Sequence, residues 1–213
     1  MHIVIFTGGQ LQNSASIQKA IKSADCILAA DSGANTAVDF GISPSIVIGD
    51  LDSIDAKIKK KLEKTTCTFI TSHSAKDETD TQLAINYAVQ NGATKITLLG
   101  GIFGDRLDHI LANLLLATVV KIPITFLNGN QICQVVKGPI TLKFIGKKND
   151  LLSLIPLSGD IRGLKTSGLQ WELHNDTLTF GMPRGVSNIF LKDNVGVAFT
   201  KGTLCIVHTS LHA

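Results

Sequence analysis

The chain changes at about residue 128 from alternating strand and helix patterns to strand patterns alone. Before that point, short apolar runs occupy positions 3–6, 26–30, 46–48, 68–70, 96–99 and 124–127. Segments with helical spacing lie between them, at 16–21, 34–40, 56–62, 81–89 and 107–120. Continuously apolar strands separated by helices are typical of a parallel sheet that helices cover on both faces. We therefore predict an α/β domain with a mostly parallel sheet for residues 1–130.

Residues 131–213 have a different pattern of predicted secondary structure. Strand-like runs at 151–154, 195–199 and 204–207 follow one another with turn signals between them, among them Ser158-Gly159 and Asn175-Asp176. Strands without intervening helices predict an antiparallel arrangement, so we expect a C-terminal all-β sandwich domain.

Composition limits the class of protein further. Of the 213 residues, 44% are hydrophobic and 17% charged, which excludes a disordered chain. The net charge of +3 is not the strongly basic charge that is typical of a nucleic-acid-binding protein. The cysteines stand singly, which is typical of reduced thiols in a cytoplasm. The longest apolar stretch, 111–127, is interrupted by Asn113, Lys121 and Pro123, and the first residues do not form a secretory signal. We expect a cytoplasmic protein with neither a nucleic-acid nor a membrane partner.

Acidic residues concentrate in four loops that follow the predicted strands. Right-handed crossovers bring such loops to one edge of a parallel sheet, where open α/β sheets bind ligands. The acids are Asp31, Asp50, Asp52, Asp77, Glu78, Asp80, Asp105 and Asp108. Helix capping is the alternative role for any one of these loops, and Thr79 with Gln82 has the spacing of a capping box. Capping does not account for acids on both sides of Leu51.

Converging carboxylates repel one another unless a cation joins them. Oxygen ligands without histidine or cysteine favour Mg²⁺ over zinc, and protein-bound Mg²⁺ usually completes its shell with phosphates. Glycines at Gly8-Gly9, Gly101 and Gly104 would let backbone N–H groups approach a phosphate. The side chains of Lys76 and Arg106 suit phosphate oxygens. The chain has neither a P-loop nor a G-x-G-x-x-G motif after its first strand. These features predict a metal–phosphate site of another kind.

Six motifs, in this order and spacing, resemble those of thiamine pyrophosphokinases. They are Asp31-Ser32-Gly33-Ala34-Asn35, Gly49-Asp50-Leu51-Asp52-Ser53, Lys76-Asp77-x-Thr79-Asp80, Gly101-x-x-Gly104-x-Arg106-x-Asp108-His109, Gly168-Leu169-Gln170-Trp171 and Gly185-Val186-Ser187-Asn188. The resemblance implies an enzyme that transfers pyrophosphate from ATP to the hydroxyl of thiamine, giving thiamine diphosphate and AMP. It also implies a homodimer with the active site between subunits, a catalytic ATP- and magnesium-binding domain (1–130) and a thiamine-binding sandwich (131–213).

The resemblance also implies a role for each matching residue. The magnesium and catalytic cluster would be Asp50, Asp52, Asp77 and Asp80. Arg106 and Asp108 would complete the catalytic set at the nucleotide end. The nucleotide pocket would comprise Gly8, Gly9, Asp31, Ser32, Asn35, Lys76, Gly101 and Arg106. Thiamine would be held by Trp171, Ser187 and Asn188.

Two other hypotheses remain open from the residues alone. The first reads Asp50-Leu51-Asp52 as the D-x-D motif of a nucleotide-sugar transferase that uses Mn²⁺, which leaves the Arg106 motif unexplained. The second is a binding module for thiamine or a nucleotide that catalyses nothing. Such a module would gain nothing from so many converging aspartates.

Overall fold

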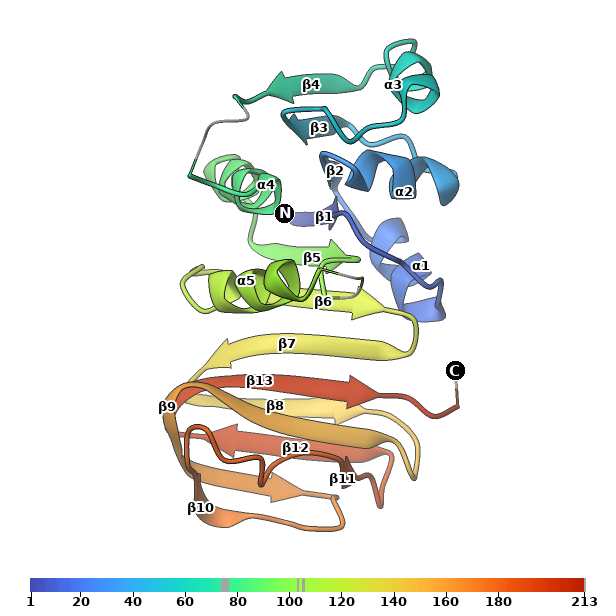
Figure 1. Ribbon diagram of the computed structural model, residues 1–213. Helices are drawn as coiled ribbons and strands as arrows, with labels where there is room; N and C mark the ends of the chain where they lie inside the picture. Colours follow the sequence, from blue (N-terminus) through green and yellow to red (C-terminus); the bar gives the residue numbers. More distant parts are fainter. Residues whose placement is uncertain (74–76, 103, 105, 213) are drawn as a thin grey trace. The chain divides into compact units, whose positions relative to one another are not determined.

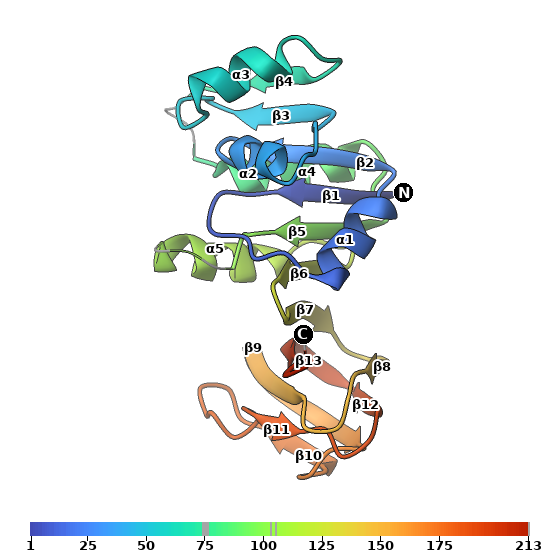
Figure 2. The same ribbon diagram turned by 90° about the vertical axis from the view of Figure 1, so that its right-hand side faces the viewer.

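The computed structural model describes residues 1–73, 77–102, 104 and 106–212. It consists of two compact units, Met1–Gly129 and Asn130–Ala213. Both are drawn in Figures 1 and 2.

The first unit is a parallel sheet with helices on both faces. Its strands lie in the order β4 (Thr68–Thr71), β3 (Ile46–Gly49), β2 (Cys26–Ala30), β1 (His2–Phe6), β5 (Lys95–Leu99) and β6 (Ile124–Asn128), and neighbouring strands pair in parallel. The helices are α1 (Ala15–Lys22), α2 (Gly33–Asp39), α3 (Ala56–Leu62), α4 (Asp80–Gln90) and α5 (Leu107–Ala117). Figure 1 shows α4 and α5 on one side of the sheet and α1, α2 and α3 on the other. Each of the six predicted strands and five predicted helices has its counterpart here.

The strand order reverses at the centre of this sheet. Strands β2, β3 and β4 succeed one another on one side of β1, and α4 then returns the chain to β5 on the other side. The loops that follow β1 and β5 therefore lead away in opposite directions and leave a crevice between them. Strand interiors such as Val4, Leu28 and Leu98 are fully buried, so the sheet is a rigid base for these loops.

The N-cap residues of α2, α3 and α4 are residues other than Asp31, Asp50 and Asp52. The Thr79 hydroxyl accepts the Gln82 N–H at 3.2 Å, which confirms the predicted cap of α4. Asp55 caps α3 by accepting the Lys57 N–H at 2.7 Å. The residue at the start of α2 is Ser32. Asp31, Asp50 and Asp52 are therefore not N-cap residues.

The second unit is an antiparallel β structure. Its strands are β7 (Gln131–Lys137), β8 (Ile140–Ile145), β9 (Leu151–Ser167), β10 (His174–Leu178), β11 (Asn188–Ile189), β12 (Asn194–Phe199) and β13 (Lys201–Thr209). The order is β7-β13-β9-β12-β8, and β10 and β11 also pair with β9. The first part of β9 pairs with β13 and its last residues with β12, so one strand joins two layers around a common apolar core. The predicted fold class, α/β followed by an all-β sandwich, is confirmed.

Two of the predicted turns in this unit are wrong. Ser158-Gly159 lies inside β9, and Asn175-Asp176 lies inside β10. Both are irregularities in a continuing strand, since the pairing register shifts there and both Gly159 and Asn175 have positive φ. A bulge uses the same residue types as a turn, so the local sequence does not distinguish them.

The described cysteines are free thiols. The closest pair, Cys133 on β7 and Cys205 on β13, is buried with a sulfur–sulfur distance of 3.4 Å. No helix in the described part of the chain has the length and apolar character needed to cross a bilayer.

Candidate active site

A polar cavity of about 320 Å³ lies in the first unit at the carboxyl edge of the sheet. The loops after β1, β2, β3 and β5 and the first turns of α4 and α5 form its wall. The predicted site residues that line it are Gly8, Gly9, Asp31, Ser32, Asp50, Asp52, Asp80, Gly101 and Arg106. Loops that lie far apart in the sequence thus meet at the crevice that the strand order creates.

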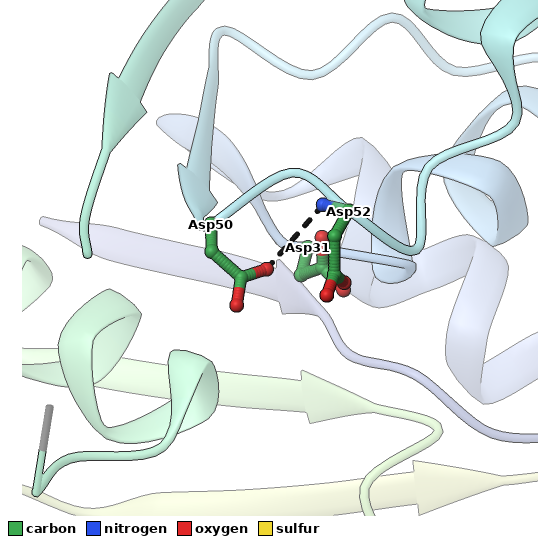
Figure 3. Close-up of side chains that lie close together, drawn as sticks. All are labelled: Asp31, Asp50 and Asp52. Carbon is green, nitrogen blue, oxygen red and sulfur yellow. Dashed lines mark hydrogen bonds between the residues drawn. The ribbon is translucent and has the colours of Figure 1, made fainter. Parts of the chain in front are cut away.

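Three carboxylates come together in this cavity, from Asp31, Asp50 and Asp52 (Figure 3). One oxygen of each lies within 4.8 Å of the others. Asp31 follows β2, whereas Asp50 and Asp52 follow the adjacent strand β3. Three negative groups at this distance, with oxygen as the only donor atom, match the preference of a hard divalent cation.

The backbone between Asp50 and Asp52 has an uncommon conformation. Leu51 has φ of 66°, a left-handed value that is disfavoured for a branched side chain. The turn lets the Asp52 N–H donate to Asp50 Oδ1 at 3.3 Å, and the Ser53 hydroxyl donates to Asp52 Oδ1 at 2.7 Å. This local network accounts for how two acids separated by one residue face the same cavity.

Asp31 is the buried member of the group. Its side chain is only 7% exposed, and Oδ1 has no hydrogen-bond partner among the described residues. Burial raises the pKa of the Asp31 carboxyl above its ordinary value, and the charges of Asp80 and Asp50 raise it further, against a backbone hydrogen bond from Ser32. A buried anion with an unused oxygen and like charges beside it is a position that a cation would stabilise.

Asp80, at the start of α4, approaches the same point from another direction. A Cβ atom on Gly49 would lie 2.9 Å from Asp31 Cβ and 3.1 Å from Asp80 Oδ1. Gly49 also has φ of 153°. The absence of a side chain at this position therefore allows both acidic side chains to approach the end of β3.

Asp77 and Lys76 differ from the residues above. Asp77 is exposed in the loop before α4 and is not part of the cavity wall or of the group of three carboxylates. Lys76 lies outside the described residues, as does Asp105.

Arg106 and Asp108 form an ion pair at the start of α5. Arg106 Nε donates to Asp108 Oδ1 at 3.0 Å and Nη2 donates to Oδ2 at 2.7 Å. This fork lowers the pKa of the Asp108 carboxyl to about 2. Arg106 lines the cavity, so Asp108 orients the positively charged Arg106 side chain at the rim of the cavity.

Asn35 lies behind the cavity wall and does not line it. Its Nδ2 donates to the Ser53 carbonyl at 3.1 Å, and its Oδ1 accepts the Asp55 N–H at 3.0 Å. The structure therefore gives Asn35 contacts that hold the loop carrying Asp50 and Asp52.

The three residues predicted to hold thiamine lie together in the second unit. Trp171 is 57% exposed, Ser187 is exposed with φ of 59°, and Asn188 is buried. The side chain of Asn188 is hydrogen-bonded to the backbone of Trp171 in both directions.

Two family models match the chain, one in each unit. Residues 17–125 match the family description "Thiamin pyrophosphokinase, catalytic domain", and residues 140–204 match "Thiamin pyrophosphokinase, vitamin B1 binding domain". The chain belongs to the thiamine pyrophosphokinase family. It is therefore an enzyme of the thiamine diphosphotransferase class, and the resemblance found in its motifs is confirmed.

Individual thiamine pyrophosphokinases are similar over most of their length. The enzyme of Bacillus subtilis (strain 168) is 30% identical over 185 residues, which cover 84% of this chain and 85% of the relative. A crystal structure of thiamine pyrophosphokinase from Bacillus subtilis superposes with a TM-score of 0.86 at 27% identity, covering 99% of this chain and 100% of the other. The yeast enzyme has the same fold, with a TM-score of 0.80 at 17% identity over 98% of this chain and 86% of its own.

Several cavity residues were not among the predicted site residues. They are Ala30, Ser53, Thr79, Thr81, His109, Ile110 and Asn113. Asn113 is buried, and its Nδ2 donates to the Gly101 carbonyl at 2.8 Å. Helical spacing contains a signal for it, because Arg106, Ile110 and Asn113 follow one another at three- and four-residue intervals on one face of α5.

Proposed function

We propose that this member of the thiamine pyrophosphokinase family transfers the β- and γ-phosphates of ATP to the hydroxyl of thiamine. The products are thiamine diphosphate and AMP. The acidic cavity supports this proposal most directly, because it combines a group of carboxylates with glycine turns and an arginine at one edge of the sheet. Family membership supports both substrates.

A magnesium ion fits the donor set of this cavity. Asp31, Asp50 and Asp52 would hold it, and the buried Oδ1 of Asp31, which has no hydrogen-bond partner in the described part of the chain, is the observation that favours a cation there. Asp80 would add charge beside Asp31, whereas a metal role for Asp77 remains a prediction from the motif alone. When bound, the ion supplies charge neutralisation for the triphosphate and polarises the transferred phosphorus.

The chain's own groups would hold the nucleotide. Gly8 and Gly9 expose backbone at the crevice and Gly101 lines it, so that a phosphate can approach N–H groups closely. The Arg106 guanidinium offers forked donors to phosphate oxygens, and Asp108 fixes its orientation. Negative charge that develops on the phosphate oxygens would thus meet donors that are already in position.

The transfer is a single in-line displacement. The thiamine hydroxyl oxygen forms a bond to the β-phosphorus, the bond from that phosphorus to the α,β-bridging oxygen breaks, and AMP leaves with the bridging oxygen. A carboxylate of the cavity accepts the hydroxyl proton. The positive charge of thiamine favours its entry into an acidic site, and the indole of Trp171 would stack on the pyrimidine ring.

We also propose a homodimer with the active site between subunits, as the family resemblance implies, and a cytoplasmic enzyme, as the singly placed cysteines favour. The free thiols support a reducing compartment. Light scattering of the purified protein would measure the oligomeric state, and a monomer at all concentrations would contradict the first of these proposals.

Product analysis tests the proposed reaction. The protein is incubated with ATP, thiamine and Mg²⁺, and we expect equal amounts of AMP and thiamine diphosphate and no accumulation of ADP. Asp52→Asn should reduce turnover at least a hundredfold, while Asp39→Asn, the same change at an exposed position on α2, should not. Binding of thiamine or a nucleotide without turnover would instead indicate a non-catalytic binding module. Preference for a nucleotide sugar with Mn²⁺ over ATP would indicate a nucleotide-sugar transferase.

A further inference from the structure

Trp171 is an exposed aromatic side chain on a turn with a well-defined backbone. It follows the end of β9, and its neighbour Leu169 is buried and forms an isolated bridge with Phe190. The Gln170 N–H donates to the Ile189 carbonyl at 2.9 Å, and the Leu191 N–H donates to the Gly168 carbonyl, also at 2.9 Å. The backbone just before Trp171 is thus fixed, while Trp171 itself is exposed.

Further contacts of this turn come from the side chain of Asn188. Its Oδ1 accepts the Trp171 N–H at 3.1 Å and also the Ile189 N–H at 2.9 Å. Its Nδ2 donates to the Trp171 carbonyl at 2.7 Å. One amide group therefore satisfies both backbone polar groups of Trp171.

These three bonds use both acceptor positions of the Asn188 amide and one of its two Nδ2 hydrogens, which leaves one donor for a ligand. An amide oxygen has two lone pairs, and both are used by backbone donors. Asn188 is also only 9% exposed, in contrast to the 57% of Trp171. Ser187, with φ of 59°, is exposed just before it, and its N–H donates to the Ser153 hydroxyl at 3.0 Å. The chain thus turns the serine outward and the asparagine inward.

We propose that Asn188 is a positioning residue that acts through Trp171 and does not itself contact thiamine. This role rests on the proposed function and refines the prediction that all three residues contact the substrate. By holding the Trp171 backbone at both its N–H and its C=O, the amide presets the indole for stacking on an aromatic ring. Preorganisation of this kind improves affinity because less freedom is lost on binding.

A double-mutant cycle separates this role from direct contact. We expect Asn188→Ala to raise the KM for thiamine about tenfold, with a smaller change in kcat, because binding loses a preset platform. In a Trp171→Ala background the same substitution should change the KM less than twofold. Equal factors in the two backgrounds would mean that Asn188 contacts thiamine itself and would overturn the proposal.

Fluorescence gives a second readout that does not depend on turnover. Trp171 is the only tryptophan, so emission of the substrate-free protein reports on this turn alone. Asn188→Ala should lower its anisotropy and raise its acrylamide quenching, and Asn188→Asp, which keeps the acceptors but loses the donor, should lie between. Asn194→Ala, the same change at an exposed position on β12, should leave the emission unchanged.

The fluorescence arm also distinguishes failure of this proposal from failure of the proposed function. If wild-type protein makes no thiamine diphosphate, the function is wrong, yet emission of the free variants still tests the positioning role. Unchanged anisotropy and quenching in a folded Asn188→Ala protein, with folding checked by circular dichroism, would overturn it. If Asn188→Ala does not fold, the same comparison is made with Asn188→Asp.

Discussion

The guanidinium of Arg106 closes on the carboxylate of Asp108 through two hydrogen bonds, of 3.0 and 2.7 Å. Both side chains are largely exposed, at 70% and 63%. Such a pair contributes little to stability at the surface, because water and salt screen it. Its position at the cavity rim instead agrees with the role proposed above for Arg106, in which Asp108 holds a forked donor in one orientation for a phosphate.

Arg106→Lys should therefore impair nucleotide binding more than folding. Lysine keeps the charge but loses the planar fork, so we expect the KM for ATP to rise about tenfold with an unchanged melting temperature. Steady-state kinetics at fixed thiamine measures this. Arg162→Lys, at an exposed arginine of the second unit, is the matched control, and equal kinetics in the two variants would exclude Arg106 from nucleotide binding.

Asp31→Asn should make the metal-free protein more stable. The substitution removes a buried charge that lies beside Asp50 and Asp80, and the amide keeps the shape of the side chain. We expect the free energy of unfolding to rise by about 1 kcal/mol and the melting temperature by a few degrees. Mg²⁺ should stabilise the wild type and not the variant. A less stable variant that still responds to Mg²⁺ would contradict the role given to Asp31.

Gly49→Ala should disturb the acidic cavity itself. Its new methyl group would meet Asp31 and Asp80 at 2.9–3.1 Å, so both carboxylates have to move. We expect a loss of about 2 kcal/mol in stability and at least a tenfold loss in kcat/KM. Gly41→Ala isolates the backbone cost, since Gly41 has φ of 74° with open space around it. It should cost about 1 kcal/mol and leave kcat/KM unchanged.

Asp150→Asn should destabilise the second unit in a pH-dependent manner. The buried carboxylate accepts hydrogen bonds from the backbone of Lys147 and Leu211 and contacts His208 at 2.9 Å. Burial alone would raise the pKa of Asp150, but these hydrogen bonds outweigh it and lower that pKa below its ordinary value. Because the folded pKa lies below the unfolded one, the stabilisation is present above about pH 4 and disappears as the pH falls through the folded value.

We expect Asp150→Asn to cost about 3 kcal/mol at pH 7, and the difference from wild type to shrink below pH 4. Urea unfolding followed by Trp171 emission reports on this unit, because the only tryptophan lies in it. Asp193→Asn provides the control at an exposed aspartate. A pH-independent difference would exclude the carboxylate charge as its source.

Local pattern was sufficient for the elements of the first unit, because most strands there are short apolar runs separated by helices. It was insufficient for β9, where Gly159 has the residue type of a turn but the register shift of a bulge, which only the partner strand β13 reveals. The site shows the same limit. Asp50 and Asp52 are grouped in the sequence, whereas Asp31 joins them only because β2 and β3 are neighbours in the sheet.

The roles of Asn35 and Asn113 depend on hydrogen bonds that a sequence motif does not reveal. Asn35 belongs to a conspicuous motif, yet its amide supports the loop behind the cavity. Helical spacing places Asn113 on the same face of α5 as Ile110, but its hydrogen bond to the Gly101 carbonyl is visible only in the fold. Side-chain hydrogen bonds to distant backbone require the fold to be known before they are visible.

Direct measurement of metal binding tests the central claim, that Asp31, Asp50 and Asp52 together hold a divalent ion. Mn²⁺ is titrated into the protein in the presence of ATP, free Mn²⁺ is followed by electron paramagnetic resonance, and Mg²⁺ is added as competitor. We predict that Mn²⁺ binds saturably and that Mg²⁺ displaces it. Substitution of Asp31, Asp50 or Asp52 by Asn should weaken the affinity for Mn²⁺ at least tenfold, whereas Asp39→Asn should leave it unchanged. Equal binding by the wild type and all three cavity variants would contradict the claim.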